Sequence, residues 1–158
     1  MTHDTQREMN RELITFEVEG QVFGLDIMAI REIRAWTPTT RLPRVPHYVA
    51  GVVNLRGTVL PVIDLAARLG WNPTEPSPRH AIIVTQMGGQ ACGLIVDAVS
   101  DIVSLPADAL QPPPANAGLS AQDAVTPFLE GLAAIGDTMV QVLNLAALGD
   151  SARLAEAA

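Results

Sequence analysis

The stretch GVVNLRGTVLPVIDL, residues Gly51–Leu65, sets one arginine between two apolar runs. Both runs are rich in β-branched residues, which favour strands, and Arg56-Gly57 falls where a tight turn would join them. The stretch therefore predicts a β-hairpin that carries Arg56 at its tip. Gly57 supplies the backbone freedom that such a turn requires, and Asn54 is a residue type that supports unusual turn conformations.

Two blocks of the sequence occur twice, in the same order and without gaps. Thr58–Ala67, TVLPVIDLAA, aligns with Thr138–Ala147, TMVQVLNLAA, and Leu13–Ile33 aligns with Ile82–Ile102. Identical residues in the second alignment include Gly20 and Gly89, Gln21 and Gln90, Gly24 and Gly93, Leu25 and Leu94, Ala29 and Ala98, and Ile33 and Ile102. Paired blocks of this kind indicate a duplicated chain, with one β-rich unit in each half.

The duplication predicts an all-β, mainly strand-built fold of two pseudo-repeated small barrels. Each half is near or below the ~70–80 residues at which an isolated core is secure, so two units packed together gain stability. Closed barrels also remove exposed sheet edges. The proline-rich connector Trp71–His80 separates a first barrel at 12–70 from a second at 80–150. Residues 1–11 are expected to form a flexible N-terminus and residues 151–158 a tail.

Short helices are predicted for two other segments, and a third fits either a helical turn or a strand. Met28–Trp36, MAIREIRAW, fits either a short helical turn or a third strand. Leu65–Trp71, LAARLGW, predicts a short helix that Gly70 can end. A further helical turn is expected near Ala121, inside a long proline-rich loop.

The composition bounds the possible partners and the compartment. The chain has 158 residues, of which 48% are hydrophobic and 17% charged, and its net charge is −7. Nucleic acid and anionic lipid both attract clustered basic residues, so this acidity argues against either as a direct partner. The single cysteine, Cys92, excludes an internal disulfide. With no signal peptide pattern and no apolar run near ~18 residues, we expect a cytoplasmic protein.

No catalytic or metal-binding motif stands out, and we expect no enzyme activity, no metal and no cofactor. The sequence contains no phosphate-binding loop, no dinucleotide-binding glycine pattern and no nucleophile elbow. His3, His47 and His80 lie at no metal-ligand spacing. An enzyme that uses Asp64, Asp97 or His80 is a weaker alternative, because no nucleophile–base pair can be assigned from spacing.

Four segments together resemble the CheW-like domains of bacterial chemotaxis, over roughly residues 12–150. They are GLDIMAIREI, TRLPRVPHYVAGVVNLRGTVLPVIDL, GLIVDAVSDIVSL and GDTMVQVLNLAAL. The run around Asn54-Leu55-Arg56-Gly57 is quite specific to such domains. The resemblance implies a single domain of two intertwined five-stranded β-barrels, between which strands are exchanged.

The resemblance also implies a non-catalytic adaptor. CheW-like domains bind the regulatory domain of the histidine kinase CheA and the cytoplasmic tip of methyl-accepting chemoreceptors, and they join these proteins into membrane-associated arrays. The family's important contact residues carry over to Arg56 and Glu32, and the same segment as Glu32 supplies Ile30. The kinase is expected mainly on the second barrel, and rings with other CheW-like domains are possible. Contact with the membrane would be indirect, through the receptors.

Two readings remain beside the adaptor hypothesis. One is a small barrel that binds a ligand, or a protein-interaction module unrelated to chemotaxis. The other concerns Arg56 itself, because a charged hairpin tip is also expected where the tip is merely solvated. Within the adaptor hypothesis, Glu32 and Arg56 are expected to pair, since they have opposite charges. The second half has Gly136-Asp137 where the first has Arg56-Gly57, so the halves should offer two inequivalent surfaces.

Overall fold

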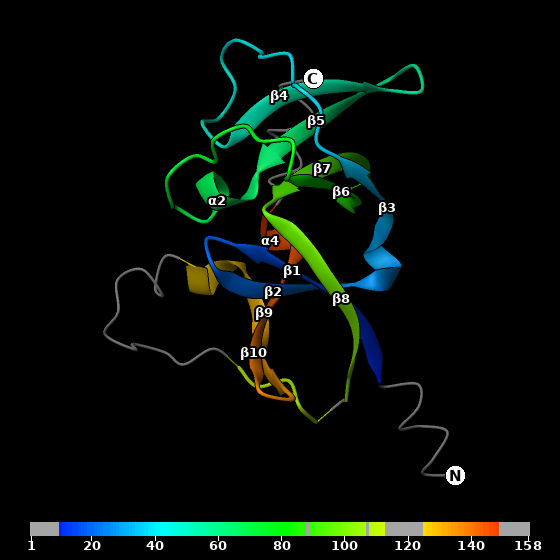
Figure 1. Ribbon diagram of the computed structural model, residues 1–158, viewed down its shortest axis with the longest axis vertical. Coiled ribbons are helices and arrows are strands. Elements are labelled where there is room, and N and C mark those ends of the chain that lie inside the picture. The colour runs from blue at the N-terminus through cyan, green and yellow to red at the C-terminus, as the bar shows by residue number, and fades with distance from the viewer. Residues whose placement is uncertain (1–9, 88, 107, 113–124, 149–158) are drawn as a thin grey trace.

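The computed structural model describes residues 10–87, 89–106, 108–112 and 125–148. Ten strands form two five-stranded sheets (Figure 1). The sheet in the lower part of Figure 1, the lower sheet, has the order β8 (Ala98–Leu105), β1 (Arg11–Val18), β2 (Gln21–Asp26), β10 (Thr138–Leu143) and β9 (Leu129–Ile135). The upper sheet has the order β3 (Ile30–Ala35), β6 (Ala81–Met87), β7 (Gln90–Val96), β5 (Thr58–Asp64) and β4 (Val49–Leu55).

Each sheet takes strands from both halves of the chain. The β1–β2 hairpin of the first half joins β8, β9 and β10, and the β6–β7 hairpin of the second half joins β3, β4 and β5. The two parallel pairings, β2 with β10 and β7 with β5, are equivalent under the duplication. The expected mainly-β fold with two intertwined five-stranded units is confirmed. The strand order nevertheless leaves β8 and β9, and likewise β3 and β4, as edges of open sheets.

Short helices lie at the strand ends. The 3-10 turn η1 (Ile27–Ala29) leads directly into β3, so Met28–Trp36 contains both the helical turn and the third strand. The helix α2 (Leu65–Arg68) lies within the predicted Leu65–Trp71, and α4 (Leu145–Leu148) is its repeat equivalent. A further 3-10 turn, η2 (Thr126–Phe128), precedes β9. The turn expected near Ala121 lies outside the described residues.

The first strand begins earlier than the sequence pattern suggested. β1 starts at Arg11, which the sequence placed in a flexible N-terminus, and its backbone pairs with Leu105 of β8. The side chain of Arg11 is tied to carboxylates on two other strands, those of Asp26 and Glu130. These long-range partners order a position that has no hydrophobic signal of its own.

One hydrophobic core joins the two sheets. Phe16 and Phe23 of the lower sheet stack with ring centroids 6.1 Å apart, and they belong to the same buried cluster as Ile63 and Leu94 of the upper sheet. All four side chains are fully buried. Burying such side chains is worth roughly 1.5–3 kcal/mol each, so packing between the two sheets contributes to the stability of both.

Arg68 fastens the two short α-helices to each other. Its Nε donates to the carbonyl of Leu148 at 2.7 Å, and its Nη2 donates to the carbonyl of Ala147 at 3.3 Å. The guanidinium also lies 4.4 Å from the ring centroid of Tyr48 and 4.5 Å from that of Phe128. A cation at the carboxyl end of α4, held between two aromatic faces, satisfies carbonyls that the helix leaves free.

Candidate partner-binding site

The tip of the β4–β5 hairpin is built as its sequence predicts. Arg56 and Gly57 have φ angles of +50° and +83°, the two positive values that a type I′ turn requires. The side-chain oxygen of Asn54 accepts a hydrogen bond from the Gly57 N–H at 2.8 Å. Asn54 and Gly57 therefore shape the turn, and Arg56, with a side chain 72% exposed, projects from it.

The Arg56 guanidinium is directed to Glu32 of β3. Arg56 Nη2 lies 2.6 Å from Glu32 Oε1, and Arg34 Nη1 lies 3.5 Å from Glu32 Oε2. The hydrogen bond from Arg56 lowers the pKa of Glu32, and the positive charges of Arg56 and Arg34 act in the same direction. The Glu32 carboxylate thus stays charged between two arginines, and the expected pairing of Glu32 with Arg56 is present in the free chain.

This ion pair bridges the gap between the two edges of the upper sheet, whose first strand is β3 and whose last is β4. Glu32 lies on the edge strand β3, and Arg56 lies at the far side of the strand order, on the β4–β5 turn. Both residues border a hollow of about 530 Å³. The hollow is lined by Arg31, Glu32, Leu55, Arg56, Thr58, Leu60, Val84 and Ala91. The charged side chains of the lining lie around the same hollow as the buried Leu60 and Val84, and charged groups around an apolar centre are typical of protein interfaces.

Ile30 is placed differently from the ion pair. It follows η1, pairs with Thr85 of β6 and is half-buried against the shared core. The exposed apolar groups nearby are Met28, 89% exposed, and Ile33, 41% exposed. Sequence reasoning did not single out either side chain. Asp26, two residues before Met28, is a common cap of a helical turn, so the turn could be foreseen from the sequence but the exposure of Met28 could not.

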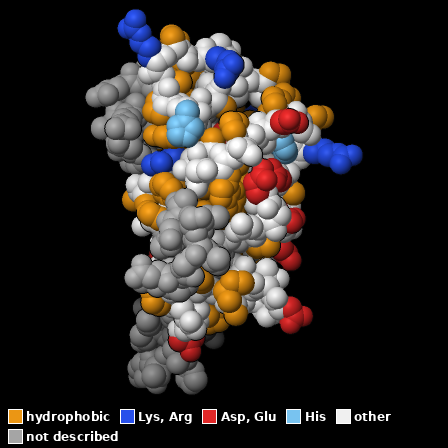
Figure 2. Space-filling model, turned by 90° about the vertical axis from the view of Figure 1, so that its left-hand side faces the viewer, with side chains coloured by type: hydrophobic (Ala, Val, Ile, Leu, Met, Phe, Trp, Pro, Cys, Tyr) orange, Lys and Arg blue, Asp and Glu red, His pale blue; other side chains and the backbone are white. Residues whose placement is uncertain are grey.

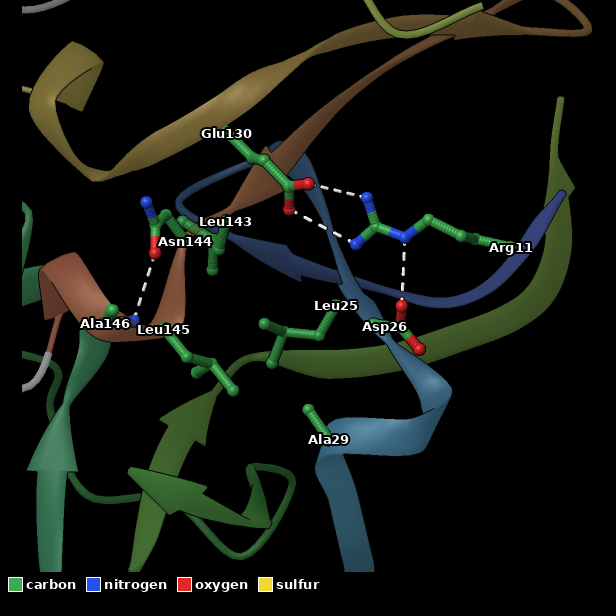
Figure 3. Close-up of a pocket in the computed structure, with 9 residues that line it drawn as sticks. All are labelled: Arg11, Leu25, Asp26, Ala29, Glu130, Leu143, Asn144, Leu145 and Ala146. Carbon is green, nitrogen blue, oxygen red and sulfur yellow. Dashed lines mark hydrogen bonds and ion pairs between the residues drawn. The ribbon is translucent and has the colours of Figure 1, made fainter. Parts of the chain in front are cut away.

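The lower sheet has an arginine-centred contact of its own, which sequence reasoning missed. Arg11 of β1 bonds to Asp26 at the end of β2 and to Glu130 of β9, and the three side chains border a hollow of about 420 Å³ (Figure 3). Leu25, Ala29, Leu143, Asn144, Leu145 and Ala146 complete its lining. Arg11 is separated from Glu130 by 119 positions, so no local pattern could reveal the contact.

The two halves differ in charge as well as in their turns. No Lys or Arg occurs between Arg79 and Arg153, whereas Arg31, Arg34, Arg41, Arg44 and Arg56 belong to the first half. On the face drawn in Figure 2, basic side chains occupy only the upper part, and acidic side chains continue to the lower end. At the second turn Gly136 has a φ of +60°, and its neighbour Asp137 is exposed. The Arg56-Gly57 turn of the upper sheet and the Gly136-Asp137 turn of the lower sheet therefore offer inequivalent surfaces.

The structure brings His80 near Asp97 and places Asp64 beside the same hollow as His80. Cys92 is fully buried, and burial raises the pKa of its thiol to about 12. His80 Nε2 lies 3.8 Å from Asp97 Oδ1, and Asp64 caps α2 while it accepts bonds from Thr74. Within the described ranges, no group of three His, Cys, Asp or Glu side chains could hold a metal ion. Nor does any helix there have the length and apolarity to cross a membrane.

Fold and site together define a duplicated two-sheet β protein with a different surface at each end. A model of the CheW-like domain matches residues 12–153. The probable chemotaxis protein CheW of Rhizobium etli is 48% identical over 139 residues, covering 88% of this chain and 87% of the relative. Chemotaxis protein CheW of Klebsiella aerogenes is 32% identical over 147 residues, covering 93% of this chain and 86% of the relative.

A solved structure agrees with these relatives. The crystal structure of the scaffolding protein TtCheW from Thermoanaerobacter tengcongensis superposes with a TM-score of 0.79 at 32% identity, covering 89% of this chain and 92% of that one. The chain belongs to the CheW-like domain family.

Proposed function

We propose that this protein is a non-catalytic adaptor that couples methyl-accepting chemoreceptors to a CheA-type histidine kinase. The observation that carries the proposal is the Arg56–Glu32 ion pair, which bridges the two edges of the upper sheet. Arginine is enriched among residues that dominate protein interfaces, and its rigid fork of donors suits carboxylates and carbonyls of a partner. Two relatives are chemotaxis proteins and the structural neighbour TtCheW is a scaffolding protein, which supports the same assignment.

In this proposal, the receptor tip binds beside β3 and the β4–β5 turn, which both belong to the first half of the chain. Arg56 and Glu32 make the polar contacts, Asn54 and Gly57 hold Arg56 in place, and Ile30 contributes apolar area beside the exposed Met28. A helical tip with apolar and polar side chains on one face would match the charged and apolar side chains that line the hollow of the upper sheet.

The kinase regulatory domain binds elsewhere, mainly on the second half of the chain, which supplies β8, β9 and β10 of the lower sheet. The support for separate sites is the inequivalence of the two ends, because Arg56 has no basic counterpart at Gly136-Asp137. Contacts with other CheW-like domains would extend the assembly into rings. The protein would then act in the cytoplasm and reach the membrane only through the receptors.

Calorimetry on both interactions tests the proposal. The titrants are the kinase regulatory domain and a receptor tip fragment from the same organism, and the proteins are wild type, Arg56→Ala and Arg79→Ala. Arg79 is exposed and does not line the hollow beside Arg56, which makes it a matched control. We expect saturable binding of both titrants by wild type, weaker receptor binding by Arg56→Ala, and no change with Arg79→Ala.

Each contrary result has a definite meaning. Equal receptor binding by Arg56→Ala and wild type would leave the adaptor role in place and make Arg56 a solvated turn residue. Failure of wild type to bind either titrant would overturn the adaptor proposal and favour a β module with a ligand or partner outside chemotaxis.

A further inference from the structure

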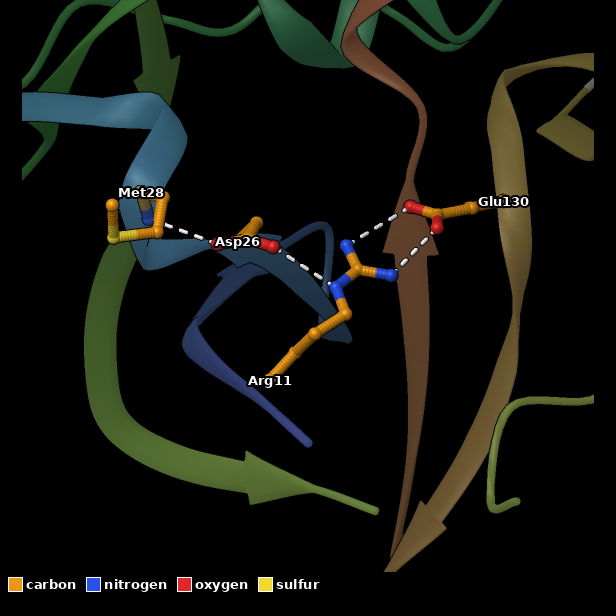
Figure 4. A network of polar contacts seen from close by, with 4 residues as sticks. All are labelled: Arg11, Asp26, Met28 and Glu130. Carbon is orange, nitrogen blue, oxygen red and sulfur yellow. Dashed lines mark hydrogen bonds and ion pairs between the residues drawn. The ribbon is translucent and has the colours of Figure 1, made fainter. Parts of the chain in front are cut away.

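Arg11 engages two carboxylates with three nitrogens. Its Nε lies 2.9 Å from Asp26 Oδ2, its Nη1 lies 2.6 Å from Glu130 Oε1, and its Nη2 lies 3.2 Å from Glu130 Oε2 (Figure 4). The side chains of Arg11 and Asp26 are each 29% exposed, and that of Glu130 is 38% exposed. The hydrogen bond to Glu130 is the main reason why the pKa of Arg11 is raised. A contact through two hydrogen bonds, as between Arg11 and Glu130, fixes both the relative orientation of the two side chains and the distance between them.

Asp26 connects Arg11 to the 3-10 turn η1, which follows it in the chain. Its second oxygen, Oδ1, accepts a hydrogen bond from the Met28 N–H at 2.9 Å and thereby caps η1. A single 3-10 turn has almost no stability of its own, so its geometry depends on the cap. The two oxygens of Asp26 therefore connect Arg11 on one side to the start of η1 on the other.

The capped turn leads into the proposed receptor contact. Met28 is the most exposed large apolar side chain in the described part of the chain, and Ile30 and Glu32 follow it on β3. Glu130 anchors the other end of the network on the edge strand β9. Figure 3 shows Arg11 between Glu130 and Asp26, with Ala29 of η1 facing the same hollow. The network thus sets the position of η1 relative to β9.

We propose that Arg11 is a positioning residue for receptor binding, which acts through Asp26 to hold η1 and thereby Met28 and Ile30. The inference rests on the adaptor function proposed above. Arg11 itself lies apart from the Arg56–Glu32 pair and needs no contact with the receptor. Arginine suits this role because its rigid fork bonds Asp26 through Nε and Glu130 through Nη1 and Nη2, whereas lysine would offer both carboxylates one flexible ammonium group.

A double-mutant cycle tests the inference. Receptor-tip affinity and 1H–15N amide spectra are measured for wild type, Arg11→Gln, Asp26→Ala and the double variant. We expect Arg11→Gln to weaken receptor binding about threefold to tenfold and to shift the Met28 and Ile30 amide signals. Because the effect passes through Asp26, Arg11→Gln should add little to Asp26→Ala. Glu12→Gln, a neutralised exposed carboxylate on the same strand, should change neither readout.

The outcomes separate this inference from the adaptor function. Additive losses in the cycle, or unchanged Met28 and Ile30 signals in Arg11→Gln, would overturn the positioning role. If wild type does not bind the receptor tip, the adaptor proposal fails, and the spectra alone decide whether Arg11 holds η1. Should Arg11→Gln fail to fold, Glu130→Gln replaces it. That variant keeps the Arg11–Asp26 pair but removes the charge that anchors Arg11 on β9, so we expect smaller shifts of the same amide signals, and unchanged signals would overturn the positioning role.

Discussion

Arg56 closes the open side of the upper sheet by bonding Glu32, with Nη2 and Oε1 2.6 Å apart. No backbone ladder joins β3 to β4 in the strand order, so this side-chain pair takes the place that hydrogen bonds would have in a closed barrel. Its energetic contribution is small because Arg56 is largely exposed. Its value is geometric, since it fixes where a guanidinium and a carboxylate are offered to a partner.

A charge exchange tests whether the pair acts as a unit. Glu32→Arg and Arg56→Glu should each weaken receptor-tip binding, because each places two like charges together. The double variant should recover part of the loss. Recovery will be incomplete because Arg34, now 3.5 Å from Glu32, would face an arginine. Calorimetric affinities of the four proteins measure the coupling, and a double variant no better than the worse single one would exclude direct pairing.

The ion pair should respond to acid in a defined direction. Arg56 lowers the pKa of Glu32, so the pair is intact above the ordinary glutamate value of about 4.3 and is lost as pH falls through the lower folded value. In Arg56→Gln the pKa of Glu32 should rise toward its ordinary value. A titration of the Glu32 carboxyl carbon signal by NMR measures both. Equal titration midpoints in the two proteins would show that the contact does not persist in solution.

The local structure was predictable from the residues themselves, whereas most long-range contacts were not. The Arg56-Gly57 turn follows from residues next to one another, and the duplication from blocks that repeat in order. The exchange of the β1–β2 and β6–β7 hairpins was implied only by the family resemblance, because the residue pattern of each strand is the same whichever strand lies beside it. Arg11 was missed because its partner Glu130 lies 119 positions away.

Charge complementarity gave a partial view of the site. Glu32 and Arg56 lie 24 positions apart, and their pairing was expected from sign and from a family resemblance rather than from geometry. Nothing in the sequence indicated that Ile30 is half-buried while Met28 is exposed, because the 3-10 turn that separates them depends on the Asp26 cap. Side-chain exposure beside short irregular turns is decided by tertiary contacts.

Arg68 should matter more for stability than any exposed arginine. Arg68→Met removes two hydrogen bonds to α4 carbonyls and the contacts with the Tyr48 and Phe128 rings. We expect the free energy of unfolding to fall by about 2–4 kcal/mol. Arg79→Met, at an exposed position, should change it by less than about 0.5 kcal/mol. Urea denaturation followed by circular dichroism measures both, and equal midpoints would mean that Arg68 does not fasten the helices.

The buried thiol should be inert in the folded protein. Burial raises the pKa of Cys92 to about 12, so at pH 8 only about one thiol in 10⁴ would be a thiolate even if a reagent could reach it. We expect no reaction with Ellman's reagent over an hour under native conditions and complete reaction in guanidinium chloride. Rapid native reaction would reveal opening between the sheets, since Cys92 belongs to the core that they share.

Gly57 should be needed for binding as well as for stability. A Cβ at Gly57 meets no atom within 4 Å, so the cost of Gly57→Ala comes from its φ of +83° alone and should be about 1 kcal/mol. Gly20 provides a matched control, with a φ of +75° in the β1–β2 turn and equally open surroundings. Both variants should lose similar stability in urea, but only Gly57→Ala should weaken receptor-tip binding, because it alone displaces Arg56. Equal receptor affinities of the two variants would show that the turn has no role beyond joining its strands.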